Sequence, residues 1–121
     1  MPIRVVLVED NQVFRETLEL LLSLRDDVEV VASVDNGAEA AAVVGSVQPD
    51  VVLMDYRLPG LNGAEATRAI RRASPHVAVV CLTASVSARE VEELYEAGAQ
   101  ACVTKDEALD RIVSAIHGAI A

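Results

Sequence analysis

The sequence predicts an α/β fold in which an open, doubly wound sheet of parallel strands is covered by helices on both faces. The first observation is that short apolar runs and amphipathic segments alternate five times along the 121 residues. The second is that the apolar runs are continuous, as is typical of buried parallel strands. The third is that a chain of single-domain size is 52% hydrophobic but only 2% aromatic. Its core must therefore be built from aliphatic side chains.

The first strand is predicted at 3–9, where IRVVLVE is a buried-type apolar run. The first helix is predicted at 12–25, because apolar side chains recur there at helical spacing. This stripe consists of Phe14, Leu18, Leu21 and Leu22. The second strand is predicted at 28–34, with the sequence VEVVASV.

A short alanine-rich helix is predicted at 37–46. Either Asp35 or Asn36 is suited to cap its first turn, and Pro49 ends the connection that follows it. The third strand is predicted at 50–54, with the sequence DVVLM.

The third helix is predicted at 63–73, where the pair Ser74-Pro75 stops it. The continuous apolar run VAVVCL then predicts the fourth strand at 77–82.

The fourth helix is predicted at 86–97 and ends at Gly98, a residue type that commonly follows helix ends. The fifth strand is predicted at 100–104, and Asp106 is suited to cap the last helix. The apolar stripes of these two helices consist of Val91, Leu94 and Tyr95 and of Leu109, Ile112, Val113 and Ile116, respectively.

Charge and hydropathy limit the partners of the chain. The formal net charge is −9, and the basic residues form no run beyond Arg71 and Arg72, with Arg68 one turn earlier. We therefore expect no direct nucleic acid binding by this domain. No apolar run approaches the roughly 18–20 residues that a membrane span needs. Charged residues follow the N-terminus too closely for a signal peptide. We expect a cytoplasmic protein with no membrane partner.

Chemically active side chains follow four of the five predicted strands. In open α/β sheets the ligand crevice lies outside the carboxyl ends of the strands, so we expect these side chains to meet at one rim. They are Glu9 and Asp10 after the first strand, Asp55 after the third, Thr83 and Ala84 after the fourth, and Lys105 after the fifth. Lys105 is the single lysine of the chain.

Three carboxylates at one rim repel each other, so such a cluster holds either protons or a cation. Oxygen ligands at a water-accessible rim suit Mg²⁺, which takes one or two carboxylates and keeps several waters. A cation and Lys105 would together neutralise phosphoryl oxygens, and the Thr83 hydroxyl would donate a hydrogen bond to them. Asp55 is then a candidate nucleophile that could carry an acyl phosphate.

Each of these residues also has an ordinary structural interpretation when it is taken alone. The alternatives are helix capping by Glu9 and Asp10, helix entry by Thr83, Ala84 and Ser85, a turn at Asp55 and a solvated surface charge at Lys105. All of these structural interpretations would have to be correct at the same time, and every one of these residues would have to lie at a strand end by chance. We therefore favour a common site.

Four motifs, in a fixed order and spacing, carry a family resemblance. They are VLVED (6–10), VVLMDYRLPGLNG (51–63), VVCLTA (79–84) and ACVTKD (101–106). With these motifs the chain resembles the receiver domain of two-component response regulators over essentially its whole length. The resemblance implies a flavodoxin-like three-layer sandwich with five helices and five parallel strands in the order 2-1-3-4-5.

The resemblance also implies roles for the strand-end residues around the phosphoryl group. Asp55 would be the phosphoacceptor and would receive a phosphoryl group from a sensor histidine kinase. Thr83 and Lys105 would bind the phosphoryl oxygens, and Ala84 would be the small residue beside the reaction path. The domain would catalyse only its own phosphorylation and dephosphorylation, without being an enzyme in the usual sense. Phosphorylation would switch the surface formed by the fourth helix, the fifth strand and the fifth helix.

The metal ligands follow from the same resemblance. Asp10 would ligate Mg²⁺ directly, together with Asp55, and Glu9 would act mainly through water. The main-chain carbonyl of Arg57 would be a further ligand.

Two positions depart from the usual receiver pattern. The position three residues before the lysine, usually aromatic, is Cys102, which would be either a small packing residue or a redox-sensitive one. Cys102 and Cys81 both lie in apolar runs, which favours buried thiols over a metal site. Asp106 stands where many receivers have proline. Together with LPGLNG, it makes the chain look most like receivers that precede a LuxR-type helix-turn-helix output domain.

The domain organisation is expected to be one receiver domain over 1–121, with no output domain within these residues. Two interpretations stay open: a receiver belonging to a longer transcription regulator, or a stand-alone receiver that acts through protein contacts. A phosphorylation-dependent homodimer is compatible with both.

Two rival classes are less consistent with the sequence. A hydrolase with an aspartyl intermediate needs a second acid two residues after the nucleophile, where this chain has Arg57. A degenerate receiver used only for binding would have lost Asp55, Asp10 or Lys105, and all three are present.

Overall fold

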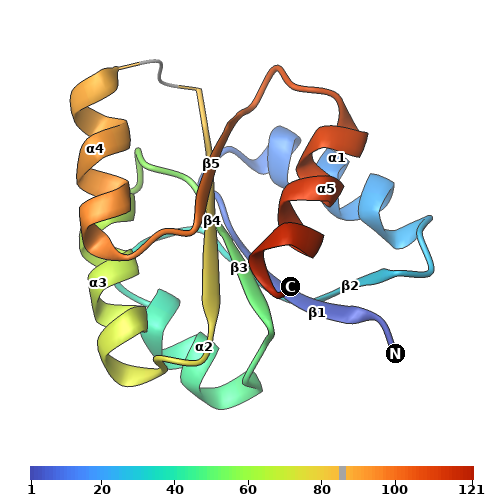
Figure 1. Ribbon diagram of the computed structural model, residues 1–121, viewed down its shortest axis with the longest axis horizontal. Helices are drawn as coiled ribbons and strands as arrows, with labels where there is room; N and C mark the ends of the chain where they lie inside the picture. Colours follow the sequence, from blue (N-terminus) through green and yellow to red (C-terminus); the bar gives the residue numbers. More distant parts are fainter. Residues whose placement is uncertain (85–86) are drawn as a thin grey trace.

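One parallel sheet organises the protein in the computed structural model, which describes residues 1–84 and 87–121 (Figure 1). Its strands lie in the order β2–β1–β3–β4–β5, and each neighbouring pair is parallel. The strands are β1 (Ile3–Val8), β2 (Val28–Val34), β3 (Val51–Met54), β4 (Ala78–Thr83) and β5 (Ala101–Thr104). The predicted fold class and strand order are confirmed.

Helices cover both faces of the sheet, as predicted (Figure 1). They are α1 (Gln12–Ser23), α2 (Ala40–Val47), α3 (Gly63–Ala73), α4 (Ala88–Ala97) and α5 (Leu109–Ala119). Helices α1 and α5 pack on one face, and α2, α3 and α4 pack on the other. Within the described residues, each helix is too short or too polar to cross a bilayer.

The core is divided by the sheet into two aliphatic layers. Because successive side chains of a strand point to opposite faces, Val5 and Leu7 of β1 join the layer under α1 and α5. Val6 and Val8 join the other layer, under α2, α3 and α4. All four residues of β3 are buried, which places this strand at the centre of the sheet and its carboxyl end at the middle of the rim.

Two helix starts differ from the predicted ones. Helix α2 begins at Ala40 because residues 38–39 form a turn, in which Asn36 Oδ1 accepts the Glu39 N–H at 2.9 Å. The prediction that Asp106 caps the last helix is wrong: α5 begins at Leu109, and the Asp106 carboxylate instead accepts the Thr104 hydroxyl.

For the fourth helix, the predicted start at Val86 lies outside the described residues. The described part of α4 is capped by Ser87, whose side chain accepts the Glu90 N–H. The helix ends at Gly98 with φ +113°, a left-handed conformation that favours glycine, as expected.

Candidate functional site

The carboxyl ends of β1, β3, β4 and β5 surround one pocket of about 440 Å³. Its lining residues are Glu9, Asp10, Asn11, Asp55, Arg57, Thr83, Ala84 and Lys105. The structure thus brings together all seven residues that the sequence predicted for the site. Asn11 is an addition to the predicted set.

Asp55 lies at the centre of this pocket and is only 5% exposed. The β-ladder fixes its backbone, since the Asp55 N–H donates to the Val8 carbonyl at 3.1 Å. Asp55 Oδ1 accepts the N–H of Tyr56 at 2.8 Å, and Oδ2 accepts from Lys105 Nζ at 3.0 Å. The carboxylate is therefore held in a defined orientation at the end of the central strand.

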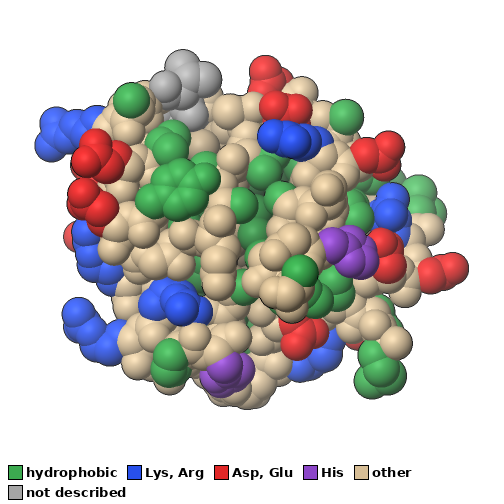
Figure 2. All heavy atoms as spheres, viewed as in Figure 1, with side chains coloured by type: hydrophobic (Ala, Val, Ile, Leu, Met, Phe, Trp, Pro, Cys, Tyr) green, Lys and Arg blue, Asp and Glu red, His purple; other side chains and the backbone are tan. Residues whose placement is uncertain are grey.

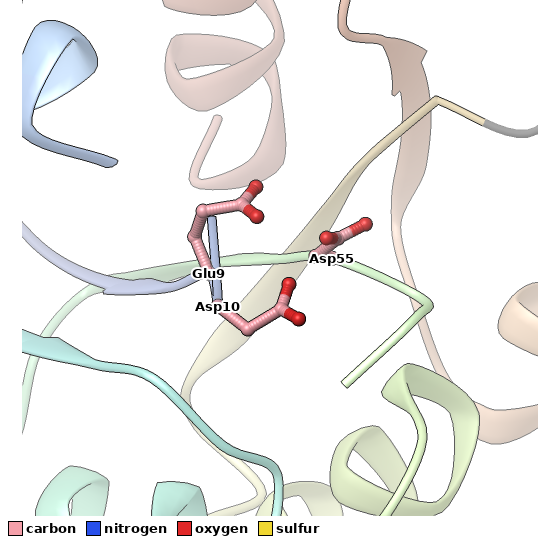
Figure 3. A group of neighbouring side chains, drawn as sticks. All are labelled: Glu9, Asp10 and Asp55. Carbon is pink, nitrogen blue, oxygen red and sulfur yellow. The ribbon is translucent and has the colours of Figure 1, made fainter. Parts of the chain in front are cut away.

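Glu9, Asp10 and Asp55 form an acidic cluster in which one carboxylate oxygen from each residue lies within 4.8 Å of the other two. Figure 3 shows the three side chains converging from the adjacent ends of β1 and β3. Glu9 is buried and Asp10 is exposed, so the cluster reaches from the protein interior to solvent. Desolvation by burial is the main reason why the pKa of Glu9 is raised above its ordinary value, although hydrogen bonds from Lys105 and Asn11 oppose it.

This donor set fits a hard divalent cation. It offers only oxygen ligands, its charge is not balanced by the single ammonium nearby, and the pocket is open to water on the Asp10 side. These are the properties that Mg²⁺ needs, because it dehydrates reluctantly and binds through few carboxylates.

Lys105 connects two of the carboxylates from the end of β5. Its ammonium lies 2.6 Å from Glu9 Oε1 and 3.0 Å from Asp55 Oδ2. Burial alone would lower the pKa of Lys105, but the hydrogen bonds to Glu9 and Asp55 outweigh it and raise the pKa above its ordinary value. Lys105 is therefore charged at neutral pH.

Phe14 and Asn11 are two contributors to the site that sequence reasoning did not assign to it. The ammonium of Lys105 lies 4.7 Å from the centre of the Phe14 ring, a cation–π contact with α1. The Asn11 N–H donates to Glu9 Oε2 at 3.0 Å, while its side chain caps α1. The sequence contained a signal for Asn11, because this residue directly follows Glu9 and Asp10. It contained none for Phe14, which was explained as part of an apolar stripe.

The loop after Asp55 folds back against the site. The Gly63 N–H donates to the Tyr56 carbonyl at 2.7 Å, and a Cβ at Gly63 would lie 2.1 Å from the Asp55 carbonyl oxygen. Gly60 has φ +81°, a conformation that side chains rarely adopt. The close return of the chain explains why this loop needs glycine, and it brings Arg57 to the pocket wall.

Thr83 and Ala84 form the wall on the β4 side. Thr83 is buried, Ala84 is exposed, and the carbonyl of Thr83 accepts the N–H of Lys105 at 2.9 Å. This bond joins the ends of β4 and β5. The threonine and the lysine are consequently fixed relative to each other by the backbone.

Comparison with known proteins agrees with this fold and site. Residues 5–117 match the family model of the response regulator receiver domain, and the chain belongs to this family. It is 38% identical over 114 residues to the transcriptional regulatory protein LnrK of Bacillus subtilis, which covers 94% of this chain and 52% of LnrK. It is 37% identical over 115 residues to the response regulator GacA of Pseudomonas viridiflava, covering 95% of this chain and 54% of GacA. The chain thus spans about half the length of these curated relatives.

Solved structures lead to the same family. The crystal structure of a LuxR-family two-component response regulator from Aurantimonas sp. SI85-9A1 superposes with a TM-score of 0.93 at 32% identity, covering 99% of this chain and 86% of that one. The response regulator domain of Thermotoga maritima CheB gives a TM-score of 0.90 at 27% identity, with 99% and 97% coverage.

Proposed function

We propose that this chain is a phosphoacceptor receiver domain that accepts a phosphoryl group from a sensor histidine kinase onto Asp55. The observation that carries the proposal is the position of the Asp55 carboxylate, which lies beside the acidic pair Glu9 and Asp10 and 3.0 Å from the ammonium of Lys105, in a pocket open to solvent. A nucleophilic oxygen beside both a cation site and a fixed positive charge is what phosphoryl transfer requires.

In the forward step, an oxygen of Asp55 forms a bond to phosphorus while the bond from phosphorus to the kinase imidazole breaks. The imidazole nitrogen keeps the electron pair of the broken bond. Mg²⁺ bound by Asp10, Asp55, the Arg57 carbonyl and, through water, Glu9 would supply charge neutralisation for the phosphoryl oxygens. Lys105, held 3.0 Å from Asp55 Oδ2, stabilises the same charge from the other side.

Thr83 and Ala84 act on the opposite wall of the pocket. The Thr83 hydroxyl donates a hydrogen bond to the arriving phosphoryl group, and the small side chain of Ala84 leaves the approach to phosphorus open. Attack of water on phosphorus later releases phosphate and restores the Asp55 carboxylate. The domain thus catalyses its own modification and its reversal.

The phosphorylated state is read at the surface of α4, β5 and α5. Lys105 and Thr83 lie at the ends of β5 and β4, so a movement at the phosphoryl group shifts an existing equilibrium between two arrangements of this surface. On the face shown in Figure 2, lysine and arginine side chains are scattered among acidic ones, which favours protein contacts over direct nucleic acid binding by this domain.

The output is proposed to be a DNA-binding transcription regulator in the cytoplasm, with receiver homodimerisation on phosphorylation. The relatives named as transcriptional and LuxR-family regulators support this, and the chain matches only about half of the curated ones. A stand-alone receiver that signals through protein contacts is the alternative. Reading the coding sequence beyond the codon for Ala121 distinguishes the two.

The phosphoacceptor proposal is tested by intact-mass measurement after incubation with Mg²⁺ and acetyl phosphate. We expect the wild-type protein to gain one phosphoryl group and Asp55→Asn to gain none. Asp26→Asn, which removes an exposed carboxylate elsewhere in the chain, is the matched control and should be modified like the wild type. If the wild type gains nothing from acetyl phosphate or from a phosphoramidate, Asp55 is not a phosphoacceptor of this kind.

A further inference from the structure

Cys81 on β4 and Cys102 on β5 are directly paired residues of neighbouring parallel strands. Paired residues of adjacent strands point to the same face, and both thiols lie in the core layer under α2, α3 and α4. Neighbouring strands lie about 4.7–4.9 Å apart, and disulfide-bonded cysteines have Cα atoms about 4.4–6.8 Å apart. The sheet therefore already holds the two cysteines at a spacing that a disulfide can bridge.

The two thiols have different surroundings. Cys81 is fully buried, whereas Cys102 is partly exposed near the edge of the sheet. The hydroxyl of Tyr95 on α4 accepts the Cys102 N–H at 3.2 Å. This polar hydroxyl group therefore lies next to Cys102. An oxidant from solvent thus reaches Cys102 before Cys81.

The hydrogen bonds at this pair favour the same order of reaction. The pKa of the Cys102 thiol is lowered, chiefly by the hydrogen bond from the Cys81 thiol and further by the Tyr95 hydroxyl, against the effect of burial. The pKa of Cys81 is raised well above its ordinary value by its hydrogen bond to Cys102 and by desolvation. Since the thiolate is the reactive form and Cys102 is the thiol that solvent reaches, Cys102 is the nucleophile and Cys81 the resolving thiol.

We propose that Cys81 and Cys102 are a redox modification site that forms a reversible intramolecular disulfide with hydroperoxides as the oxidant. The Cys102 sulfur attacks one peroxide oxygen, the O–O bond breaks, and the other oxygen leaves as an alcohol or water, which gives a sulfenic acid at Cys102. The Cys81 sulfur then attacks the Cys102 sulfur, and the S–O bond breaks. Hydroxide leaves and takes the Cys81 proton, so that water is released.

In this sequence the two thiols together lose two electrons and two protons, and the peroxide is reduced to an alcohol and water. A dithiol reductant reverses the reaction by thiol–disulfide exchange. The reaction uses neither Asp55 nor a cation. It is therefore chemically independent of the proposed phosphoacceptor function, and the disulfide should still form in Asp55→Asn.

The test is intact-mass measurement of the reduced, folded protein after treatment with hydrogen peroxide, under conditions that fully oxidise a small dithiol. We expect a monomer that has lost two hydrogens, about 2 Da, and that has lost iodoacetamide labelling at both cysteines. Dithiothreitol should restore both the mass and the labelling. Oxygen adducts without loss of hydrogen, a disulfide-linked dimer, or two cysteines that remain fully labelled would each overturn the proposal.

Two variants test the order of the steps, with circular dichroism to show that each is folded. Cys81→Ala removes the resolving thiol and its hydrogen bond to Cys102, so peroxide should react more slowly than in the wild type but should leave a sulfenic acid at Cys102 that dimedone traps. Cys102→Ser should lose the reaction entirely, with no dimedone adduct at Cys81. The assignment of Cys102 as the first thiol fails if Cys81 is labelled instead, and the resolving role of Cys81 fails if dimedone labels Cys102 equally in Cys81→Ala and the wild type.

Discussion

Lys105 is the residue on which the charge balance of the pocket depends. Its ammonium contacts both Glu9 and Asp55, which are almost completely buried, while its own side chain is 18% exposed. Two buried carboxylates without this partner would repel each other at a site where water screens them poorly. The lysine therefore contributes to stability as well as to the proposed chemistry.

Replacing Lys105 by Met should lower the free energy of unfolding by about 1–3 kcal/mol at pH 7 in the absence of Mg²⁺. Below about pH 4, where free carboxyl groups are protonated in any case, the difference from wild type should shrink. Urea denaturation at both pH values measures this. Arg89→Met is the control: Arg89 is exposed and pairs with Glu93 on the helix surface, so it should change stability by less than about 0.5 kcal/mol.

The strand-end residues of the site were predictable because one rule places them. Parallel strands put their carboxyl ends at one rim, so Asp10, Asp55 and Lys105 had to meet once the strands were recognised. The pairing of Cys81 with Cys102 depends on the register of β4 against β5, which no local pattern encodes. The same holds for the contact of Tyr95 with Cys102, since it depends on how α4 packs on the sheet.

Among the elements, α3 shows how local signals fix boundaries. It runs over the predicted 63–73, and it begins with a capping box in which Asn62 and Glu65 each accept the other's backbone N–H. The starts of α2 and α5 were misplaced because short turns precede them. There, Asn36 and Asp106 use their side chains in the turns instead of capping the helices directly.

The same glycine-to-alanine substitution should have opposite effects on the free energy of unfolding at two helical positions. One position follows the loop between β3 and α3, and the other lies in α2. Gly63→Ala should lower the free energy of unfolding by about 1–3 kcal/mol, because the new methyl would lie 2.1 Å from the Asp55 carbonyl oxygen. Gly45→Ala in α2 should raise it by about 0.5–1 kcal/mol, because no atom of the described residues lies within 4 Å of the added methyl and alanine favours the helix. Thermal and urea denaturation measure both, and equal effects at the two positions would contradict the close approach at Gly63.

At the scale of the whole molecule, Asp27 connects the turn between α1 and β2 with the last helix, α5. It lies between α1 and β2, its carboxylate accepts from Arg25 Nε at 2.9 Å, and His117 Nε2 of α5 lies 2.7 Å away. The hydrogen bonds from Arg25 and His117 hold the pKa of Asp27 well below its usual range. A carboxyl group with a depressed pKa in the folded state adds stability above its unfolded pKa, and this stability is lost as the pH falls toward the folded value.

Asp27→Asn should therefore lower the melting temperature at pH 7, and the difference from wild type should shrink progressively below about pH 4. Differential scanning calorimetry between pH 7 and pH 2 measures the effect. The neighbouring substitution Asp26→Asn removes an exposed carboxylate and should change the melting temperature at pH 7 by less than Asp27→Asn does. A difference for Asp27→Asn that grows on acidification would refute the assigned role of the carboxylate.

The position of β5 at the edge of the sheet has a mechanical consequence. Glu9, Asp10 and Asp55 extend from β1 and β3, which are each clamped by strands on both sides. Lys105 extends from β5, which pairs with β4 alone among the described strands. The pocket thus has a stiff inner half that presents the carboxylates and a compliant outer half that presents the lysine. A small displacement of β5 would change the electrostatics of the pocket without breaking the inner ladder, and the cysteine bridge proposed above would stiffen this compliant half.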